Sequence, residues 1–257
     1  MIVLLHGFMD SPHTWDLVRP YLPDDVLTPA LPGHLGGPPL NGDLDLAAHV
    51  ERVMDAAGVE RAHIVGNSLG GYLALVLAAR GRAESVVALA PAGGGDHSET
   101  LALQERLAGV AGVAGTGRAR VPLPVEITPA VARRATALLT VRYEHLPPEA
   151  IAYLVAGAAA CDAAPLLADA RQHGWPLDTA KVRCPVRVIW GLADQLLPWP
   201  ASAEGYRRSL DAEWVELDDV GHAPQLDIPL ETAQLILGFT TARIASSNGP
   251  SSSPFSR

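Results

Sequence analysis

The sequence predicts an α/β protein with a mostly parallel sheet that is flanked by helices and carries a helical insertion. Three observations lead to this prediction. Short apolar runs alternate with helical patterns through residues 2–89, a long Ala- and Leu-rich stretch without a clear strand follows, and the alternation then resumes. Strands that alternate with helices indicate βαβ units, and such units form parallel sheets with helices on both faces.

The first alternating part is predicted to contain four strands connected by helices. The strands are expected at residues 2–5, 25–29, 62–65 and 85–89, and the helices at residues 15–22, 43–57 and 69–80. Helix 43–57 shows its pattern most clearly, because Leu44, Ala47, Val50 and Met54 recur at helical spacing.

The stretch 93–181 has a different composition and predicts only helices. They are expected near residues 99–110, 129–143, 148–160 and 164–172, and they are separated by Pro122, Pro124, Pro147 and Pro148. We interpret this stretch as a helical cap inserted into one α/β domain.

After the insertion, the sequence predicts strands at residues 186–190 and 213–217 and helices at residues 201–210 and 229–245. The α/β core would then consist of residues 1–92 and 182–245. The Ser-rich tail, residues 246–257, is predicted to be disordered.

The composition of the 257-residue chain excludes several classes of protein. A 48% share of hydrophobic residues supplies a large core, and the net charge of −9 disfavours binding to nucleic acids or anionic membranes. The two cysteines, Cys161 and Cys184, are too few for a disulfide framework. Neither metal-ligand spacing nor a Gly-x-Gly-x-x-Gly motif occurs, so neither a metal nor another cofactor is expected. Without a signal peptide or a membrane-spanning apolar run, the protein is predicted to be cytoplasmic.

The segment Gly66-Asn67-Ser68-Leu69-Gly70 fits the motif Gly-x-Ser-x-Gly and lies between a predicted strand and a predicted helix. In that context the motif forms a sharp turn that exposes the serine hydroxyl at the sheet edge as a nucleophile. The glycines leave room for the turn, since Cβ atoms at these positions would collide with their neighbours. The following helix points its N-terminal N–H groups at any anion that forms on the substrate.

A nucleophilic serine needs a base, and the base needs an acid that orients it. His222 follows the predicted strand 213–217, and Asp194 follows the predicted strand 186–190. The three side chains therefore lie on loops after predicted strands in the order Ser, Asp, His, and we predict that they form a catalytic triad. Asp96 is the alternative acid, although a run of three glycines separates it from its strand.

The dipeptide His6-Gly7 follows the first predicted strand and indicates an oxyanion hole. Gly7 would let the backbone turn tightly, so that the N–H group of Phe8 faces the site together with the N–H group of Leu69. These donors would lie on either side of the point where the strand order reverses, which is where open α/β sheets bind ligands.

Together these segments resemble the α/β-hydrolase superfamily over essentially residues 1–245. The resemblance rests on the segments His6-Gly7-Phe8, Leu31-Pro32-Gly33-His34, 66–71, 190–194 and 221–224. It implies the α/β-hydrolase fold, with Ser68 as nucleophile, His222 as base and Asp194 as acid. It also implies that the helical stretch 93–181 forms a cap over the pocket.

The chain departs from this family at its start. Relatives usually carry a two-stranded hairpin before the His-Gly strand, whereas this chain opens directly on that strand. The N-terminal β-hairpin is therefore expected to be missing, and the remaining strands would run in the family order 4-3-5-6-7-8. One edge of such a sheet would be exposed.

The predicted function is that of a cofactor-free serine hydrolase that cleaves a small or medium apolar ester, thioester or lactone through an acyl-enzyme. Its expected partner is therefore a small ester-like molecule. Candidates for the walls of the substrate pocket are Met9, Tyr143, Tyr153 and Trp175.

Several alternatives stay open. A carbon–carbon bond hydrolase of ring-cleavage products fits Gly-Asn-Ser-x-Gly-Gly, but no Trp follows His222 closely and no carboxylate-binding Arg stands out in the cap. A cofactor-free haloperoxidase or a lyase would use the same triad. A receptor-like relative without catalysis is the alternative from another class, because a fold does not fix a role. Epoxide hydrolases and haloalkane dehalogenases are disfavoured, since their nucleophile is Asp where this chain has Ser68.

Overall fold

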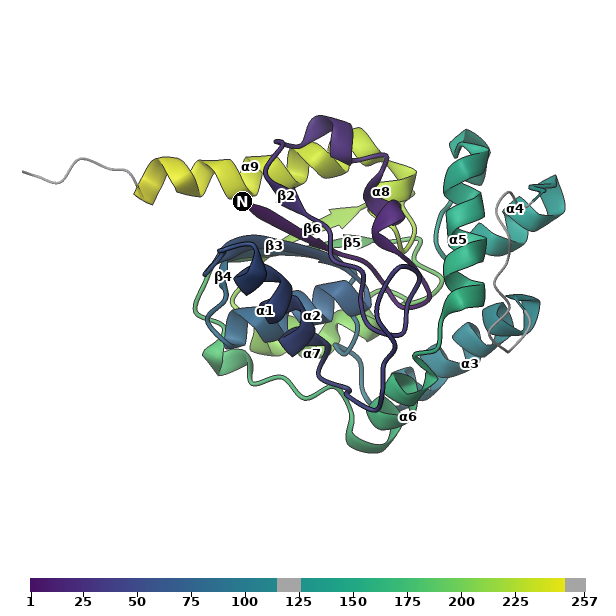
Figure 1. Ribbon diagram of the computed structural model, residues 1–257, viewed down its shortest axis with the longest axis horizontal. Helices are drawn as coiled ribbons and strands as arrows, with labels where there is room; N and C mark the ends of the chain where they lie inside the picture. The colour runs from purple at the N-terminus through teal and green to yellow at the C-terminus, as the bar shows by residue number, and fades with distance from the viewer. Residues whose placement is uncertain (115–125, 248–257) are drawn as a thin grey trace, which may run out of the picture.

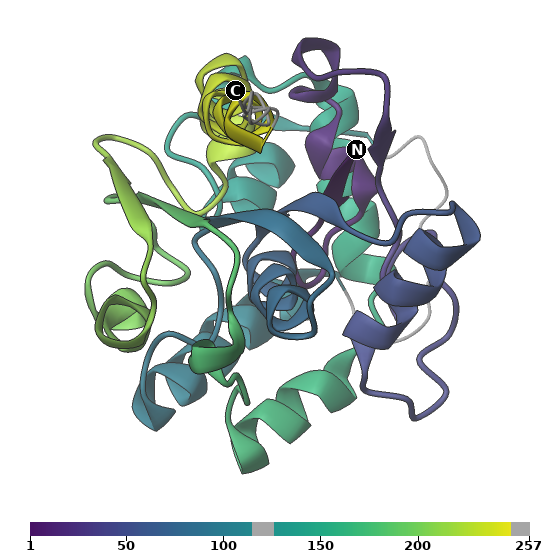
Figure 2. The ribbon, with the colours of Figure 1, turned by 90° about the vertical axis from the view of Figure 1, so that its left-hand side faces the viewer.

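The computed structural model describes residues 1–114 and 126–247, and these residues form a parallel six-stranded sheet surrounded by helices (Figures 1 and 2). Its strands are β1 (Ile2–Leu5), β2 (Val26–Leu27), β3 (Ala62–Asn67), β4 (Ala83–Leu89), β5 (Val186–Gly191) and β6 (Glu213–Leu217). They lie in the order β2-β1-β3-β4-β5-β6, and each neighbouring pair is parallel. The predicted fold class and strand order are therefore confirmed.

Helices cover both faces of the sheet (Figure 1). α1 (Leu46–Ala56), α2 (Leu69–Ala79) and α7 (Glu204–Ser209) cover one face, and α9 (Pro229–Ser247) covers the other. Alternate residues of a strand point to opposite faces, so the strands contribute to two separate apolar cores. Val3 and Leu5 belong to one core, whereas Ile2 and Leu4 pack in the core that contains Ile236 of α9.

Four helices lie between β4 and β5 in the chain and stand together at one end of the sheet (Figure 1). They are α3 (His97–Ala114), α4 (Pro129–Thr136), α5 (Pro148–Ala160) and α6 (Ala164–His173). α5 contacts both α3 and α4, and α6 contacts α3. Helices thus occupy the stretch where the sequence predicts them, while their role as a cap stays a prediction. Pro122 and Pro124 lie outside the described residues.

Several predicted helices differ from the observed ones. In place of the helix predicted over residues 15–22, the chain forms two short 3-10 turns, Pro12–Trp15 and Arg19–Tyr21, because Pro20 has no N–H group for an α-helical hydrogen bond. The helix predicted over residues 129–143 ends at Thr136. Beyond it, the carboxylate of Asp227 accepts hydrogen bonds from the N–H groups of residues 141 and 142. Residues 201–210 split into a 3-10 turn, Ala201–Ala203, and α7.

The end of the chain also differs from the prediction. Residues 246 and 247 belong to the last turn of α9 and not to a disordered tail, whereas residues 248–257 lie outside the described part of the structure. The short helix α8 (Pro224–Asp227) and the 3-10 turns Tyr143–His145 and Thr179–Lys181 have no counterpart in the prediction.

No single helix in the described residues has both the length and the apolar composition needed to cross a membrane. α5 and α6 meet these two criteria only as a pair, and the pair is bent by 69°.

Candidate active site

The turn between β3 and α2 places Ser68 in a strained conformation at the carboxyl edge of the sheet. Its φ of 56° and ψ of −117° lie outside the regions that residues with a Cβ atom usually adopt. A Cβ atom on Gly66 would overlap the carbonyl group of Gly70, and one on Gly70 would overlap the carbonyl group of Leu5. As predicted, this turn has no room for a Cβ atom at positions 66 and 70.

Gly70→Ala is expected to lower the free energy of unfolding by about 3 kcal/mol or more, because the added methyl group overlaps backbone carbonyl groups of β1 and the loop after it. Gly238→Ala is the matched control. Apart from the backbone of α9 itself, no atom of the described residues lies within 4 Å of a Cβ atom at that position, so this change should stabilise the protein by about 0.5–1 kcal/mol. Urea unfolding measures both effects. Equal stability of the two variants would contradict the close approach of α2 to β1.

The loop after β5 buries Asp194 and aims its carboxylate at His222. Oδ2 of Asp194 lies 2.7 Å from Nδ1 of His222, while Oδ1 accepts hydrogen bonds from the N–H groups of Leu196 and Leu197 at 2.8 Å and 2.7 Å. Both oxygens are occupied, so the carboxylate is held in one orientation. Asp194 is 3% exposed and His222 is 1% exposed, and such burial strengthens the hydrogen bond between them.

Asp96, the alternative acid, has a different role. It lies exposed, and its Oδ1 accepts hydrogen bonds from the hydroxyl of Ser98 at 2.6 Å and from the N–H group of Glu99 at 3.1 Å. These are the contacts of a residue that caps the start of a helix, here α3. The structure thus brings Asp194, and not Asp96, to the histidine.

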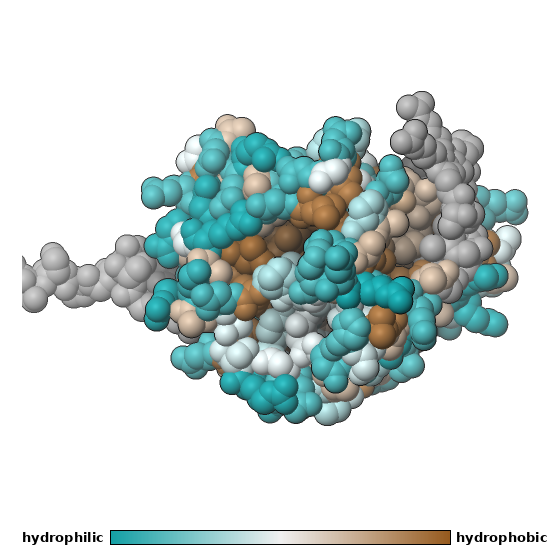
Figure 3. All heavy atoms as spheres, turned by 90° about the horizontal axis from the view of Figure 1, so that it is seen from below, coloured by the Kyte–Doolittle hydropathy of each residue, from teal (hydrophilic) through white to brown (hydrophobic). Residues whose placement is uncertain are grey.

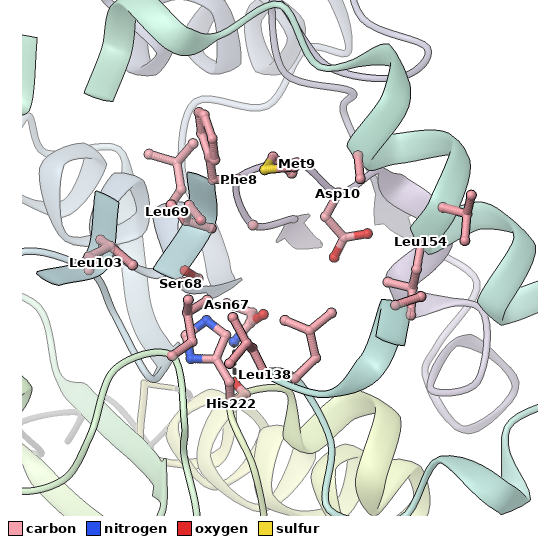
Figure 4. Close-up of a pocket in the computed structure, with 18 of the residues that line it drawn as sticks. Phe8, Met9, Asp10, Asn67, Ser68, Leu69, Leu103, Leu138, Leu154 and His222 are labelled. Carbon is pink, nitrogen blue, oxygen red and sulfur yellow. Dashed lines mark hydrogen bonds between the residues drawn. The ribbon is translucent and has the colours of Figure 1, made fainter. Parts of the chain in front are cut away.

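Two hydrogen bonds fix the loop that carries His222. The side-chain amide of Asn67 donates a bond of 2.9 Å to the carbonyl oxygen of His222, and Oδ2 of Asp227 accepts a bond of 2.7 Å from the N–H group of Gly221. Since Asn67 directly precedes Ser68, the first bond ties the histidine loop to the serine turn. Nε2 of His222 has no hydrogen-bond partner in the described part of the chain, and the ring lies next to Ser68 at the pocket wall (Figure 4). The imidazole therefore has a free nitrogen beside the serine.

The segment after β1 lies against the serine turn, since a Cβ atom on Gly7 would be 3.4 Å from the Cβ atom of Ser68. The tight turn predicted at Gly7 occurs instead at Met9, which has a φ of 61°. The N–H group of Phe8 makes no hydrogen bond within the described residues, and the N–H group of Leu69 has no partner in its helix because Leu69 is the first residue of α2. Both residues line the pocket with Ser68, so two free donors lie at the serine.

These residues open onto a pocket of about 400 Å³ between the sheet edge and helices α3–α6 (Figure 4). Most of the side chains that line it from the inserted stretch are apolar, and they are Leu103, Leu107, Ala130, Val131, Ala135, Leu138, Leu139, Leu154, Val155, Ala158 and Leu167. An apolar pocket of this volume with a few polar groups is typical of a small-molecule site. The face of the molecule seen in Figure 3 is, by contrast, largely hydrophilic, with apolar residues gathered in its central part.

Of the four predicted wall residues, Met9 and Trp175 line the pocket, whereas Tyr143 and Tyr153 do not. The ring of Tyr153 stacks on the ring of His13, with their centroids 3.5 Å apart. Tyr143 packs against an apolar cluster that includes Leu146 and Leu226. The aromatic character of these residues gave no information about which side of the insertion they occupy.

The pocket wall contains two charged residues, Asp10 and Arg134, that the sequence does not clearly mark as pocket residues. The carboxylate of Asp10 points into the cavity (Figure 4), and burial raises its pKa to about 6. Arg134 of α4 lines the pocket too, although no carboxylate-binding Arg stands out in the sequence of the insertion. The position of Asp10 shortly after the first predicted strand indicates a place near the site, but the sequence contains no comparable signal for Arg134.

Among the residues that the structure describes, no group of three or more His, Cys, Asp or Glu side chains is placed to hold a metal ion. The site consists of a serine, a paired histidine and aspartate, free backbone N–H groups and apolar walls. Such a set is able to perform nucleophilic attack with general-base assistance.

Comparison with known proteins identifies the family. The pattern described as Alpha/beta hydrolase family matches residues 2–235. The chain belongs to the alpha/beta hydrolase family.

Named relatives cover most of this alpha/beta hydrolase. Epoxide hydrolase EphH of Mycobacterium tuberculosis is 32% identical over 212 residues, which are 76% of this chain and 92% of that protein. The pimeloyl-(acyl-carrier protein) methyl ester esterase of Aromatoleum aromaticum is 33% identical over 255 residues, which are 91% of this chain and 96% of that protein. The crystal structure of a membrane phospholipase A, a bacterial virulence factor, has a TM-score of 0.70 at 26% identity and covers 96% of this chain and 79% of that one. The protein is thus a hydrolase of the alpha/beta type.

A pair of buried histidines supports the loop after β1 of this alpha/beta hydrolase. Nε2 of His6 accepts a hydrogen bond of 3.0 Å from the N–H group of Leu31, and Nδ1 of His34 donates one of 3.0 Å to the carbonyl oxygen of Pro32. The two rings meet edge to face, with their centroids 5.2 Å apart. Burial lowers the pKa of His6 to about 3 and that of His34 to about 4, so both rings are neutral at pH 7.

Acid is expected to destabilise the protein through these rings. Below pH 6.5 the unfolded state binds the proton that folded His34 binds only near pH 4, so stability falls by up to about 1.4 kcal/mol per pH unit in that window. In His34→Gln, the stability lost between pH 6.5 and 4.5 should therefore be about 2 kcal/mol smaller than in the wild type. Urea unfolding at both pH values measures the two losses, and equal losses would contradict a neutral buried His34.

Proposed function

We propose that this alpha/beta hydrolase is a serine esterase that cleaves small or medium apolar carboxylic esters, thioesters or lactones through an acyl-enzyme. The observation that carries the proposal is the position of Ser68 at the floor of an apolar pocket, beside a histidine whose other ring nitrogen is held by Asp194. The methyl ester esterase of Aromatoleum aromaticum, at 33% identity, supports ester chemistry for this chain as well.

The proposed reaction uses each group at a stated atom. Nε2 of His222 takes the hydroxyl proton of Ser68 while the serine oxygen attacks the carbonyl carbon of the ester. The N–H groups of Phe8 and Leu69 donate hydrogen bonds to the oxyanion. Collapse of this intermediate breaks the bond to the alcohol, which leaves with the proton from Nε2. Water then attacks the acyl-enzyme with the same assistance, releases the acid and restores Ser68.

Epoxide hydrolysis is the second candidate, because the Mycobacterium tuberculosis relative carries that name. The chemistry of Ser68 argues against it. A serine oxygen that opens an epoxide forms an ether, and water does not release an ether as it releases the ester formed by an Asp nucleophile. Ester hydrolysis is therefore preferred for this chain.

A series of p-nitrophenyl esters of increasing acyl length tests the proposal. Each methylene group buried in the pocket contributes up to about 0.8 kcal/mol, so kcat/KM should rise by up to about fourfold per methylene until the pocket is full and then fall. Leu138→Trp narrows the pocket and should move the maximum to shorter chains. Leu230→Trp, on the exposed side of α9, should leave the maximum unchanged.

Two outcomes would count against this function. Rates that are independent of acyl length in all three proteins would show that the acyl chain binds elsewhere. Hydrolysis of an epoxide such as styrene oxide, without activity on any ester of the series, would favour the second candidate.

A further inference from the structure

The pocket wall contains one acid among the lining residues that the structure describes, and that acid is Asp10. Its carboxylate points into the cavity on the side where Leu138 and Leu154 lie (Figure 4). Apolar side chains offer a carboxylate no hydrogen bonds, so on that side Asp10 can still bond to a polar group of a bound molecule. In the proposed reaction Asp10 takes no part, because His222 is already paired with Asp194.

The backbone around Asp10 is built to hold this side chain in place. Oδ1 of Asp10 accepts a hydrogen bond of 2.8 Å from the N–H group of Ser11, and the hydroxyl of Thr14 donates a further one to the carboxylate. Helix α5 packs closely on the same loop at Gly157, where a Cβ atom would lie 3.2 Å from Cα of Asp10. The carboxylate is therefore presented to the cavity in a fixed orientation.

A chain of buried amides connects this wall to the serine turn. The side-chain amide of Gln225 donates hydrogen bonds of 3.2 Å to the hydroxyl of Thr14 and of 3.0 Å to Oδ1 of Asn67. Asn67 precedes Ser68 and also binds the carbonyl oxygen of His222. These hydrogen bonds fix Asp10 relative to Ser68. A residue that binds one part of a substrate needs such a fixed position relative to the nucleophile.

The electrostatics favour a neutral hydrogen-bonding group over a cation as the ligand of Asp10. Burial raises the pKa of Asp10 to about 6, so its protonated and ionised forms are both accessible near neutral pH. A hydroxyl group bonds to either form, as a donor to the carboxylate or as an acceptor from the acid. An ammonium group has only donors and therefore bonds to the ionised form alone.

We propose that Asp10 binds a hydroxyl group of the substrate, so that the preferred substrate is an ester with a hydroxyl group on its acyl or alcohol part. Asp10 is then a specificity-determining residue. This inference rests on the proposed esterase function.

Matched ester pairs test this assignment. The two members of a pair differ at one position, where one ester has a terminal methyl group and the other has a hydroxyl group. In one series this position is the end of the acyl chain, and in the other series it is the end of the alcohol. The ratio of kcat/KM for the hydroxyl member over the methyl member should fall about tenfold or more in Asp10→Leu, in at least one series. Any loss in Asp10→Leu should be larger for the hydroxyl member than for the methyl member, because only the hydroxyl member bonds to the carboxylate.

Two further variants separate recognition from folding. Asp10→Asn keeps a hydrogen-bonding group at the same place and should retain part of the preference for the hydroxyl member. Asp24→Leu removes an exposed carboxylate outside the pocket and should leave the ratio unchanged. An equal loss on both members of every pair in Asp10→Leu and Asp10→Asn would assign Asp10 a structural role and overturn the proposal. A preference for ammonium-ended over hydroxyl-ended esters would overturn it too.

A binding measurement keeps this test separate from the esterase function. If the wild type hydrolyses none of the esters, the proposed function fails, and calorimetry on Ser68→Ala with a linear diol and the alkanol of equal length decides the role of Asp10. Tighter binding of the diol that is lost in the double variant Ser68→Ala/Asp10→Leu supports a hydroxyl site. Equal binding of the diol and the alkanol contradicts one.

Discussion

Ser68→Ala is expected to lower kcat/KM for the best p-nitrophenyl ester by roughly 10⁴-fold or more. The substitution removes the oxygen atom that forms the acyl-enzyme, and the free N–H groups of Phe8 and Leu69 alone supply only a small residual rate. The fold should survive, since the change deletes one oxygen atom that faces the pocket and fills no core position. Steady-state kinetics and a urea unfolding curve measure the two effects.

The control for this variant is Ser209→Ala, which removes an exposed hydroxyl that donates a bond of 2.8 Å to the carbonyl oxygen of Gly205 in its own helix. It should retain the wild-type rate. Esterase activity in Ser68→Ala equal to that of Ser209→Ala would show that another residue is the nucleophile.

Asp194→Asn is expected to lower kcat by about 10⁴-fold while the protein stays folded. Oδ1 of residue 194 accepts two backbone hydrogen bonds, from Leu196 and Leu197, and an asparagine satisfies them only with its oxygen in that place. Its NH₂ group then faces Nδ1 of His222 and donates to it. The ring is left with its proton on Nε2, which is the wrong tautomer for accepting the proton of Ser68.

Asp96→Asn is the matched control, because Asp96 is the other acid that the sequence offers and it caps α3 at the surface. This variant should keep full activity. A large loss in Asp96→Asn together with an active Asp194→Asn would contradict the observed pairing of His222, whichever activity is assayed.

The sheet and the positions of Ser68, Asp194 and His222 were predictable because their signals are local. Buried runs such as residues 62–65 mark strands, and chemistry-bearing residues directly after such runs must come together at the carboxyl edge of a parallel sheet. Glycines on both sides of Ser68 mark it further, because the turn has no room for a Cβ atom at their positions. The pairing of His222 with Asp194 follows from the same rule.

The pocket walls were less predictable because they depend on contacts between distant parts of the chain. Tyr153 and Leu154 are neighbours in sequence, yet one stacks on His13 while the other lines the pocket. Helical periodicity separates the two sides of α5 but does not say which of them faces the serine. The end of the helix at Thr136 was equally hidden, since it coincides with hydrogen bonds to Asp227, some 90 residues away in the chain.

The most direct test of the proposed esterase is mass spectrometry of the protein after reaction with a fluorophosphonate, which adds covalently to an activated serine. We expect one adduct per chain, on the peptide that contains Ser68, with loss of esterase activity in proportion to labelling. Asp194→Asn should label much more slowly, because its histidine no longer activates the serine. Complete inactivation with the adduct on another residue, or undiminished ester hydrolysis by a protein fully labelled at Ser68, would contradict the account.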